Sequence, residues 1–384
     1  MILARAVSLL SQKLLFSIAG ILGIGFLIGF HELGHFLFCK LFNIRTPSFS
    51  IGFGPKLFKK KIGETEFALS AIPLGGYVEI AGSAEMGQGG QEQAHAQDEQ
   101  SFANKPFYQK LLVMLGGIMF NLAFAYAAVV LLFMVGMPKT AFLYPFNTRP
   151  IVAEVVKDSA AEKAQLLAGD RIIAIANQKI AEADDYNNVP TIIRLLKPLA
   201  GQQTTITVDR QGVEKELPIT IGGTDTGVLG VVFDVIDMPK YSFVDSIKKA
   251  LNLTNAYIAA TAKAYKNIFV KRDVSNMGGP LAVMAVTMKG AGEGFSIYLL
   301  ILAIISINLA ILNLIPLPIL DGGQILFLII EAIIRRPLPI KVKEYIHIAS
   351  WLMILALFVY LSYNDLLKIV SPYFKKLITY LGWN

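Results

Sequence analysis

Residues 29–38 read GFHELGHFLF, and they place two histidines and a glutamate inside one of the most apolar stretches of the chain. Ionisable side chains within an apolar span are energetically costly unless they have partners, so such groups mark functional sites. If the segment is helical, His31 and His35 lie at i and i+4 on one face, with Glu32 beside them. The stretch therefore predicts a membrane-spanning helix that carries chemistry.

The composition agrees with a membrane protein. Of the 384 residues, 54% are hydrophobic and only 16% are charged, whereas a typical soluble domain carries about 25% charged residues. Four stretches lack any charged residue or histidine: Leu14 to Phe30, Leu111 to Pro138, Gly294 to Leu320, and Ile348 to Asn364. A span needs about 20 apolar residues, with a lower limit near roughly 17. We therefore expect a polytopic α-helical membrane protein with about four transmembrane helices.

The first apolar stretch follows Arg5 and Lys13, as a signal peptide would, but it ends in His31 rather than in a small-residue cleavage site. We therefore expect a retained span. The net charge of +7 does not indicate nucleic-acid binding, because the basic residues concentrate beside the spans. By the positive-inside rule, the connections after the first span and before the fourth are cytoplasmic, although Lys368, Lys375 and Lys376 run against this orientation.

Between the first two spans, residues 66–80 read EFALSAIPLGGYVEI, in which strand-like stretches flank the turn signal Pro73 to Gly76. The pattern predicts a small hairpin against the membrane face. The next segment, Gly82 to Ser101, has no apolar periodicity and is expected to be a loop in which His95 is solvated.

A change in composition divides the chain into four parts. Residues 1–149 form the first part of a membrane catalytic core, and 294–384 form the second. Residues 150–222 have the short strand-like runs of a soluble domain, with a helical stretch near Thr191 to Leu196. Residues 223–293 are expected to hold a connecting strand and a basic amphipathic helix from Tyr241 to Lys271, which either lies on the membrane surface or packs on the neighbouring domain.

HELGH at 31–35 matches HExxH, in which two imidazoles at i and i+4 can chelate Zn²⁺ and the glutamate acts as general base. A catalytic zinc needs a third protein ligand and an open position for water. Glu64 and Glu66 are candidates, but they lie beyond a basic segment. Asp321 is the stronger candidate, because it ends the third apolar stretch, where an unpartnered carboxylate would be costly.

The segment before Asp321 is expected to break the third span. Pro316 and Pro318 lack backbone donors, and Gly322 and Gly323 permit tight turns. A broken helix at membrane depth is tolerated only against protein or a wet cavity, so the same segment predicts access for water. Asn313 either holds a substrate backbone or oxyanion, or pairs with the freed helix carbonyls.

Together, HELGH, the run NLAILNLIPLPILDGG, the hairpin sequence AIPLGGYVEI and an inserted domain resemble the bacterial site-2 protease family, of the regulator-of-sigma-E protease type. The stretch Ala160 to Ile173 resembles the helix-turn-strand signature of a PDZ domain, with Gln165 where glycine is usual. Close relatives often carry two PDZ domains and a histidine after Asp-Gly-Gly, whereas this chain shows one such unit and Gln324.

The resemblance implies zinc bound by His31, His35 and Asp321, with Glu32 as the catalytic residue. It implies a substrate-binding set of Asn121, Asn313, Pro316 and Pro318, with Gly52, Phe53, Gly54, Gly75 and Gly76 in β elements that add the substrate as a strand. Gly116 and Gly117 belong to its small-residue pattern in the second span.

The expected activity is zinc-dependent intramembrane endoproteolysis of single-span membrane proteins, such as anti-sigma factors or signal-peptide remnants, in a bacterial inner membrane. The active site would lie near the cytoplasmic side and the PDZ-like domain in the periplasm, where it would bind a new substrate C-terminus or exclude bulky ectodomains. Two alternatives are an ion-coupled transporter and a non-catalytic PDZ scaffold. No inverted repeat favours the transporter, and every expected ligand argues against the scaffold.

Overall fold

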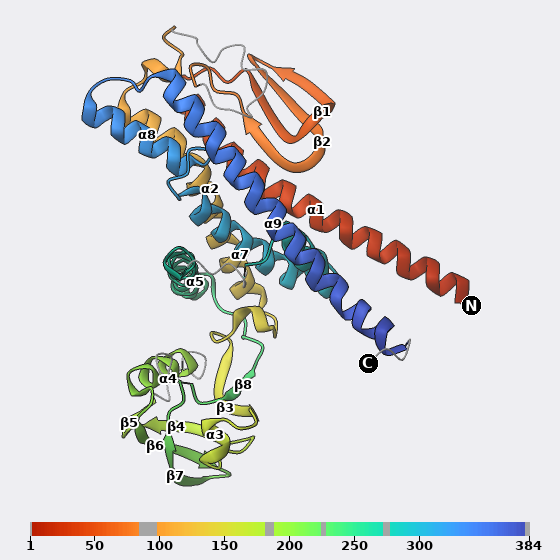
Figure 1. Cartoon of the computed structure of the whole chain (residues 1–384), viewed down its shortest axis with the longest axis vertical. Coiled ribbons are helices and arrows are strands. Elements are labelled where there is room, and N and C mark those ends of the chain that lie inside the picture. The colour runs from red at the N-terminus through yellow and green to blue at the C-terminus, as the bar shows by residue number, and fades with distance from the viewer. Residues whose placement is uncertain (1, 84–97, 181–187, 224–227, 272–276, 381–384) are drawn as a thin grey trace. The chain divides into compact units, whose positions relative to one another are not determined.

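The computed structural model describes residues 2–83, 98–180, 188–223, 228–271 and 277–380 (Figure 1). The chain divides into two compact units. The helical unit comprises Met1–Leu131 and Ile247–Asn384, and the β-rich unit comprises Leu132–Ser246.

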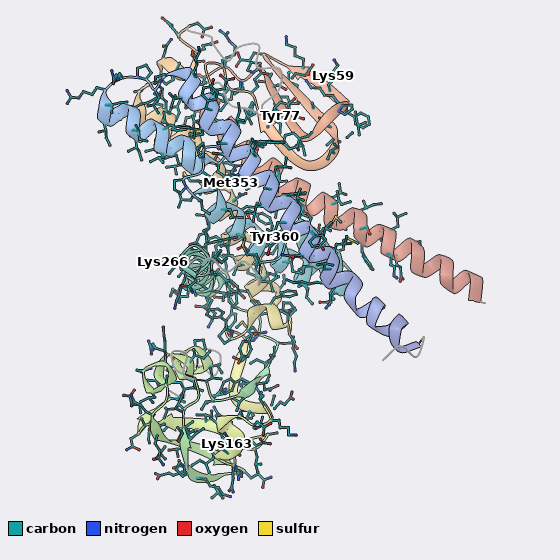
Figure 2. All side chains as sticks on the ribbon, viewed as in Figure 1. Lys59, Tyr77, Lys163, Lys266, Met353 and Tyr360 are labelled. Atoms are coloured by element: carbon teal, nitrogen blue, oxygen red, sulfur yellow. The ribbon has the colours of Figure 1, made fainter. Side chains whose placement is uncertain are left out.

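Long helices dominate the first unit. Their bounds are α1 Ile2–Leu41, α2 Phe107–Val135, α5 Phe243–Lys271, α6 Pro280–Glu293, α7 Phe295–Asn313, α8 Asp321–Ile334 and α9 Ile340–Tyr380. A short 3₁₀ helix, η1, spans Phe102–Asn104. Among the described residues, four segments are long and apolar enough to cross a membrane: Ser11–Leu41, Phe107–Val135, Phe295–Asn313 and Lys341–Lys368. They contain or overlap the four predicted spans. On α9, Met353 and Tyr360 are about half exposed (Figure 2), as lipid-facing side chains would be.

The third apolar stretch is broken as the prolines predict. Helix α7 ends at Asn313, a turn follows, and α8 begins at Asp321. A Cβ added at Gly322 or Gly323 would overlap the carbonyls of Leu314 or Leu317. The two glycines therefore let the N-terminal turn of α8 approach the broken segment closely.

Helices α1 and α2 cross at glycines. A Cβ on Gly116 would lie 2.7 Å from the carbonyl oxygen of Gly34, and a Cβ on Gly34 would overlap the backbone of Gly116. Glycine brings two backbones closer than any other residue allows, as in other membrane helix pairs. A separate contact joins α6 to α9, where buried Asp365 accepts hydrogen bonds from the backbone N–H groups of Gly279 and Ala282 at 3.1 and 2.9 Å.

The predicted membrane-face β structure is present, but its pairing differs from a simple hairpin. Strand β1 spans Ser48–Ile62 and β2 spans Thr65–Val78. Ser50 pairs with both Ala68 and Tyr77, so the start of β1 lies between two parts of β2. The chain does reverse near Pro73 to Gly76, but its two arms are separated by β1, because β1 satisfies the backbone hydrogen bonds of both.

The β-rich unit contains a six-stranded sheet in the order β7-β6-β4-β3-β8, with β5 paired to β4. Its strands are β3 Thr148–Val155, β4 Arg171–Ile175, β5 Gln178–Lys179, β6 Gln203–Arg210, β7 Val213–Thr220 and β8 Val231–Val235; its helices are α3 Ala160–Lys163, α4 Asn188–Leu196, η2 Ala141–Leu143 and η4 Lys197–Leu199. Strand β8 lies beyond residue 222 but pairs with β3. The compact unit is therefore longer than the domain expected from composition.

One turn in this unit explains a departure from the PDZ pattern. Gln165 adopts φ +59°, the left-handed region that glycine occupies without cost. A glycine at position 165 would adopt this conformation without the steric cost that the glutamine bears. The carbonyl of Gln165 accepts a hydrogen bond from Arg210, which also pairs with buried Asp170 at 2.7 Å.

Some expectations concern other segments. The expected loop at 82–101, with His95, lies mostly outside the described residues. The expected amphipathic helix corresponds to α5, on which Asn255 accepts a hydrogen bond from Tyr126 of α2. The sequence did not predict α6.

Candidate metal centre

Helix α1 continues through the HELGH segment and ends at Leu41. His31 and His35 are buried, with exposed fractions of 9% and 6%. Their Nε2 atoms lie 3.2 Å apart, as the i, i+4 spacing predicts. The geometry of one helix therefore brings the Nε2 atoms of both histidines close enough to bind one metal ion.

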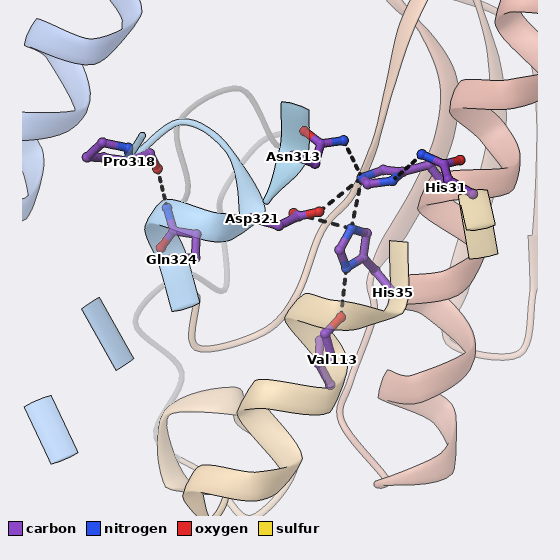
Figure 3. A network of polar contacts seen from close by, with 8 residues as sticks. His31, His35, Val113, Asn313, Pro318, Asp321 and Gln324 are labelled. Carbon is purple, nitrogen blue, oxygen red and sulfur yellow. Dashed lines mark hydrogen bonds and ion pairs between the residues drawn. The ribbon is translucent and has the colours of Figure 1, made fainter. Parts of the chain in front are cut away.

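Asp321 reaches the same point from the first turn of α8 (Figure 3). Its Oδ2 lies 3.3 Å from His31 Nε2, and its Oδ1 lies 3.4 Å from His35 Nε2. Among the described residues, these three side chains are the one group of histidine, cysteine or acidic residues close enough to hold a metal ion together. Two imidazoles and one carboxylate form a donor set that is typical of catalytic zinc.

The spacing of these atoms can be compared with zinc geometry. A tetrahedral zinc with ligand distances of about 2.0–2.1 Å separates its ligand atoms by roughly 3.3 Å. Here the two Nε2 atoms lie 3.2 Å apart, His31 Nε2 lies 3.3 Å from Asp321 Oδ2, and His35 Nε2 lies 3.4 Å from the other carboxylate oxygen, Oδ1. Asp321 Oδ2 is also buried without a hydrogen-bond partner. The three residues therefore fit a zinc ion, which they would hold between the two imidazoles and the carboxylate.

Helix α2 supports this site along one stripe. The carbonyl of Val113 accepts a hydrogen bond from His35 Nδ1 at 2.8 Å, and Asn121 contacts His31 Nδ1 at 3.1 Å. Gly117 lies between them, where a Cβ would overlap both imidazole rings. Positions i, i+4 and i+8 share one helix face. On this face of α2, the carbonyl of Val113 and the amide of Asn121 contact the two histidines, and Gly117 leaves room for their rings.

A cavity of about 440 Å³ opens beside these ligands. Its lining includes the predicted residues His31, Glu32, His35, Phe53, Gly75, Gly76, Asn121, Asn313 and Asp321. Gly52, Gly54, Pro316 and Pro318 are not among its lining residues. Gly52 and Gly54 instead allow β1 to adopt φ of +91° and +85°, and the prolines shape the turn before α8.

Glu32 lies on the cavity wall between the ligands and the β1–β2 sheet. Its carboxyl group is hydrogen-bonded to the backbone of Val78. A Cβ on Gly76 would be 3.2 Å from Glu32 Cγ, so the glycine lets the last part of β2 pass close to the glutamate. The carboxylate and a strand backbone therefore face the same space.

Asn313 ends α7 at the rim of the ligand cluster. Its Nδ2 lies 3.5 Å from His31 Nε2, at the limit of a hydrogen bond. The alternative third ligands lie elsewhere: Glu64 pairs with Lys40, and Glu66 pairs with Lys56. Among the acidic candidates considered from the sequence, only Asp321 meets the histidines.

The cavity also includes residues that the sequence did not indicate. Ile28, Tyr77, Met114 and Trp351 line it, and Trp351 comes from α9. An apolar side chain in an apolar span carries no pattern that separates a cavity wall from a lipid-facing position. Gln324 lies outside the cavity lining and donates to the Pro318 carbonyl at 2.7 Å, while it contacts His347 at 2.6 Å.

The similarity of the whole chain to known proteins agrees with this geometry. Residues 19–357 match the model of Peptidase family M50. The chain is 32% identical over 366 residues to "Putative zinc metalloprotease Cj1068" of Campylobacter jejuni, covering 92% of this chain and 94% of that protein. It is 31% identical over 373 residues to "Putative zinc metalloprotease Atu1380" of Agrobacterium fabrum, covering 91% and 95%.

Each similarity extends over more than nine tenths of this chain and of the relative. This relationship supports a metalloprotease rather than a transporter or a non-catalytic scaffold. The chain belongs to Peptidase family M50, the site-2 protease family, and is a zinc-dependent metalloprotease with helices that can cross a membrane.

Proposed function

We propose that the protein is an intramembrane endopeptidase whose zinc is held by His31, His35 and Asp321 and that cuts single-span membrane proteins. The observation that carries this proposal is the meeting of His31, His35 and Asp321, whose Nε2 atoms lie 3.2 Å apart and within 3.3 and 3.4 Å of the two carboxylate oxygens. These ligands lie in the unit that also contains the candidate spans. Ionisable groups buried within an apolar span raise the free energy of the folded protein, so they are rarely present without a function.

Zinc bound there would lower the pKa of a water molecule toward about 7 and would polarise the scissile carbonyl. Glu32 would accept the proton of the attacking water and deliver it to the leaving amine. It lies one residue from His31 and lines the same cavity. Its hydrogen bond to the Val78 backbone holds the carboxyl group at the cavity wall.

The β1–β2 sheet supports a mode of substrate binding. Residues 76–78 pair with residues 49–51 of β1 on one side, and no other described strand pairs with their second side. A helical substrate hides its carbonyls in backbone hydrogen bonds, so it must unwind before attack. Pairing with this strand edge would replace the lost hydrogen bonds. Gly75 and Gly76 would let a substrate backbone approach the edge.

Other residues form the proposed substrate-binding set. Phe53 lies against Gly75, where a Cβ would overlap its ring, and it lines the cavity beside Asn313. Gly52, Gly54, Pro316 and Pro318 would act through the shape of the strand and the turn, since they are not among the residues lining the cavity. Asn121 also lines the cavity, and its side chain contacts His31.

The proposed location is a bacterial inner membrane, with the active site near the cytoplasmic side. The basic segment after α1 supports this orientation, and Lys59 projects from the β1–β2 sheet (Figure 2). The β-rich unit would be the PDZ-like domain on the opposite side, at residues 150–222 or slightly beyond. It would bind a newly formed substrate C-terminus or exclude bulky ectodomains.

The test uses detergent-purified protein and a candidate single-span substrate, with products mapped by mass spectrometry. Glu32→Gln should retain zinc and fold but stop cleavage, because the amide cannot accept the proton. Glu64→Gln is the matched control, since Glu64 pairs with Lys40 away from the cavity, and it should cut at the wild-type rate. A Glu32→Gln variant that still cuts normally would refute the assignment, as would cleavage only outside the membrane segment of the substrate.

A further inference from the structure

Asn121 of α2 lies directly behind His31 and is fully buried. Its Nδ2 is 3.1 Å from His31 Nδ1. Its Oδ1 is buried and has no hydrogen-bond partner among the described residues. A buried amide oxygen without a partner is costly, and this oxygen would gain a partner if the amide were turned so that Oδ1 faced the His31 ring.

The orientation of this amide decides which nitrogen of His31 carries the proton. With Nδ2 toward the ring, the amide donates to Nδ1, and the proton of the neutral imidazole must be on Nε2. Nε2 is the atom that faces Asp321 and His35. A protonated Nε2 has no lone pair for a metal ion, so that tautomer cannot serve as a zinc ligand.

Rotation of the Asn121 amide by 180° exchanges Oδ1 and Nδ2. Oδ1 then accepts the Nδ1–H of His31, while Nδ2 takes the buried position at which Oδ1 had no partner. The tautomer that a zinc ligand requires therefore favours this orientation. The lone pair of Nε2 then points toward the space between His35 and Asp321. Metal-ligating histidines in general donate their second N–H to an oxygen acceptor, and His35 already has one in the Val113 carbonyl.

We propose that Asn121 is a positioning residue that fixes His31 in its zinc-binding tautomer, rather than a group that binds substrate. The inference rests on the proposed role of His31 as a zinc ligand. Buried Ser306 of α7 donates to the backbone carbonyl of Asn121 at 2.8 Å and so holds this turn of α2 in place. Val113, Gly117 and Asn121 then form one supporting stripe for both histidines.

The test measures zinc affinity by chelator competition in the full-length purified protein, without any substrate. Asn121→Leu removes the acceptor at similar side-chain volume and should weaken zinc binding about 10–100-fold. Asn121→Asp keeps an oxygen acceptor and should bind zinc close to wild type. Met119→Ala, at a half-exposed position of the same helix, is the control. The absorption spectrum of Co²⁺-loaded protein should change in Asn121→Leu only.

The variants distinguish a role of Asn121 in zinc binding from a role in substrate binding. Wild-type zinc affinity in Asn121→Leu, with reduced cleavage, would overturn the proposal and indicate a substrate contact. Equal weakening in Asn121→Leu and Asn121→Asp would also overturn it, since the acceptor would then be irrelevant. If Asn121→Leu does not fold, Asn121→Ala carries the same expectation. Failure of the proposed function is distinguishable, because His31→Ala would then bind zinc normally.

Discussion

Replacement of Gly117 by alanine tests whether α2 shapes the metal centre. The new Cβ would lie 2.6 Å from His31 Nδ1 and even closer to His31 Cε1 and His35 Nε2. Non-bonded heavy atoms are most stable at about 3.5–4.0 Å. The two imidazoles must therefore move by roughly 1 Å, or α2 must move away from α1 by a similar amount.

The magnitude follows from two opposing effects. An alanine in a helix is favoured over glycine by about 1 kcal/mol, whereas overpacking a well-packed interior costs about 1–3 kcal/mol. The net loss of stability should thus be at most about 2 kcal/mol. The effect on the site should be much larger, because a displacement of about 1 Å at reacting groups can reduce the rate by about 10²-fold.

The assay compares zinc affinity and kcat/KM of Gly117→Ala with those of Met119→Ala, which alters a half-exposed side chain on the same helix. Gly117→Ala should lose about 10–100-fold in zinc affinity and about 10²-fold in kcat/KM. Its melting temperature with excess chelator should stay near wild type. Full zinc affinity and activity in Gly117→Ala would show that the close approach of α2 to the histidines is not required.

Two further predictions concern contacts outside the ligand set. Burial would raise the pKa of Asp170, but hydrogen bonds from Arg210 and from the Leu167 N–H hold this pKa below its usual value. The ionised Asp170 therefore stabilises the fold above about pH 4, and this stabilisation is lost as the pH falls through the folded-state pKa. In the wild type, peptides covering residues 160–175 should lose protection from hydrogen exchange when the pH drops below about 4. In Arg210→Met, the same peptides should already show low protection at pH 7. Equal protection in both proteins at pH 7 would contradict this. Gln324→Leu should leave zinc affinity unchanged but raise KM severalfold in the cleavage assay, because the Pro318 carbonyl and His347 lose their shared hydrogen-bond donor. An unchanged KM would show that the contacts of Gln324 do not position the turn before α8.

The membrane architecture was accessible from the sequence because it depends on local composition. Each candidate span coincides with an apolar stretch, and the break at Asn313 follows from prolines that lack a backbone donor. The pairing of His31 with His35 was also predictable, since an α-helix fixes the geometry of residues at i and i+4. Asp321 was chosen as the third ligand because a carboxylate at the end of an apolar stretch needs a partner.

The sequence was less informative where contacts join distant segments. It predicted a reversal near Pro73 to Gly76 but not the insertion of β1 between the two arms of β2, because strand pairing is a long-range choice. Trp351 was not expected at the cavity, since nothing in its apolar surroundings separates it from a lipid-facing residue. The same holds for Val113, whose contribution is a backbone carbonyl that any side chain would leave in place.

By itself, the sequence determined the candidate spans, the broken third helix and the residue types of the proposed metal centre, because local periodicity, apolar length and the cost of buried charge control them. Only the tertiary structure decided how α1, α2 and α8 meet. The approach of Gly34 to Gly116 brings the α2 stripe behind the histidines, and the second nitrogen of each ring then finds its partner there. Such partners depend on the packing of whole helices, so no short stretch of sequence specifies them.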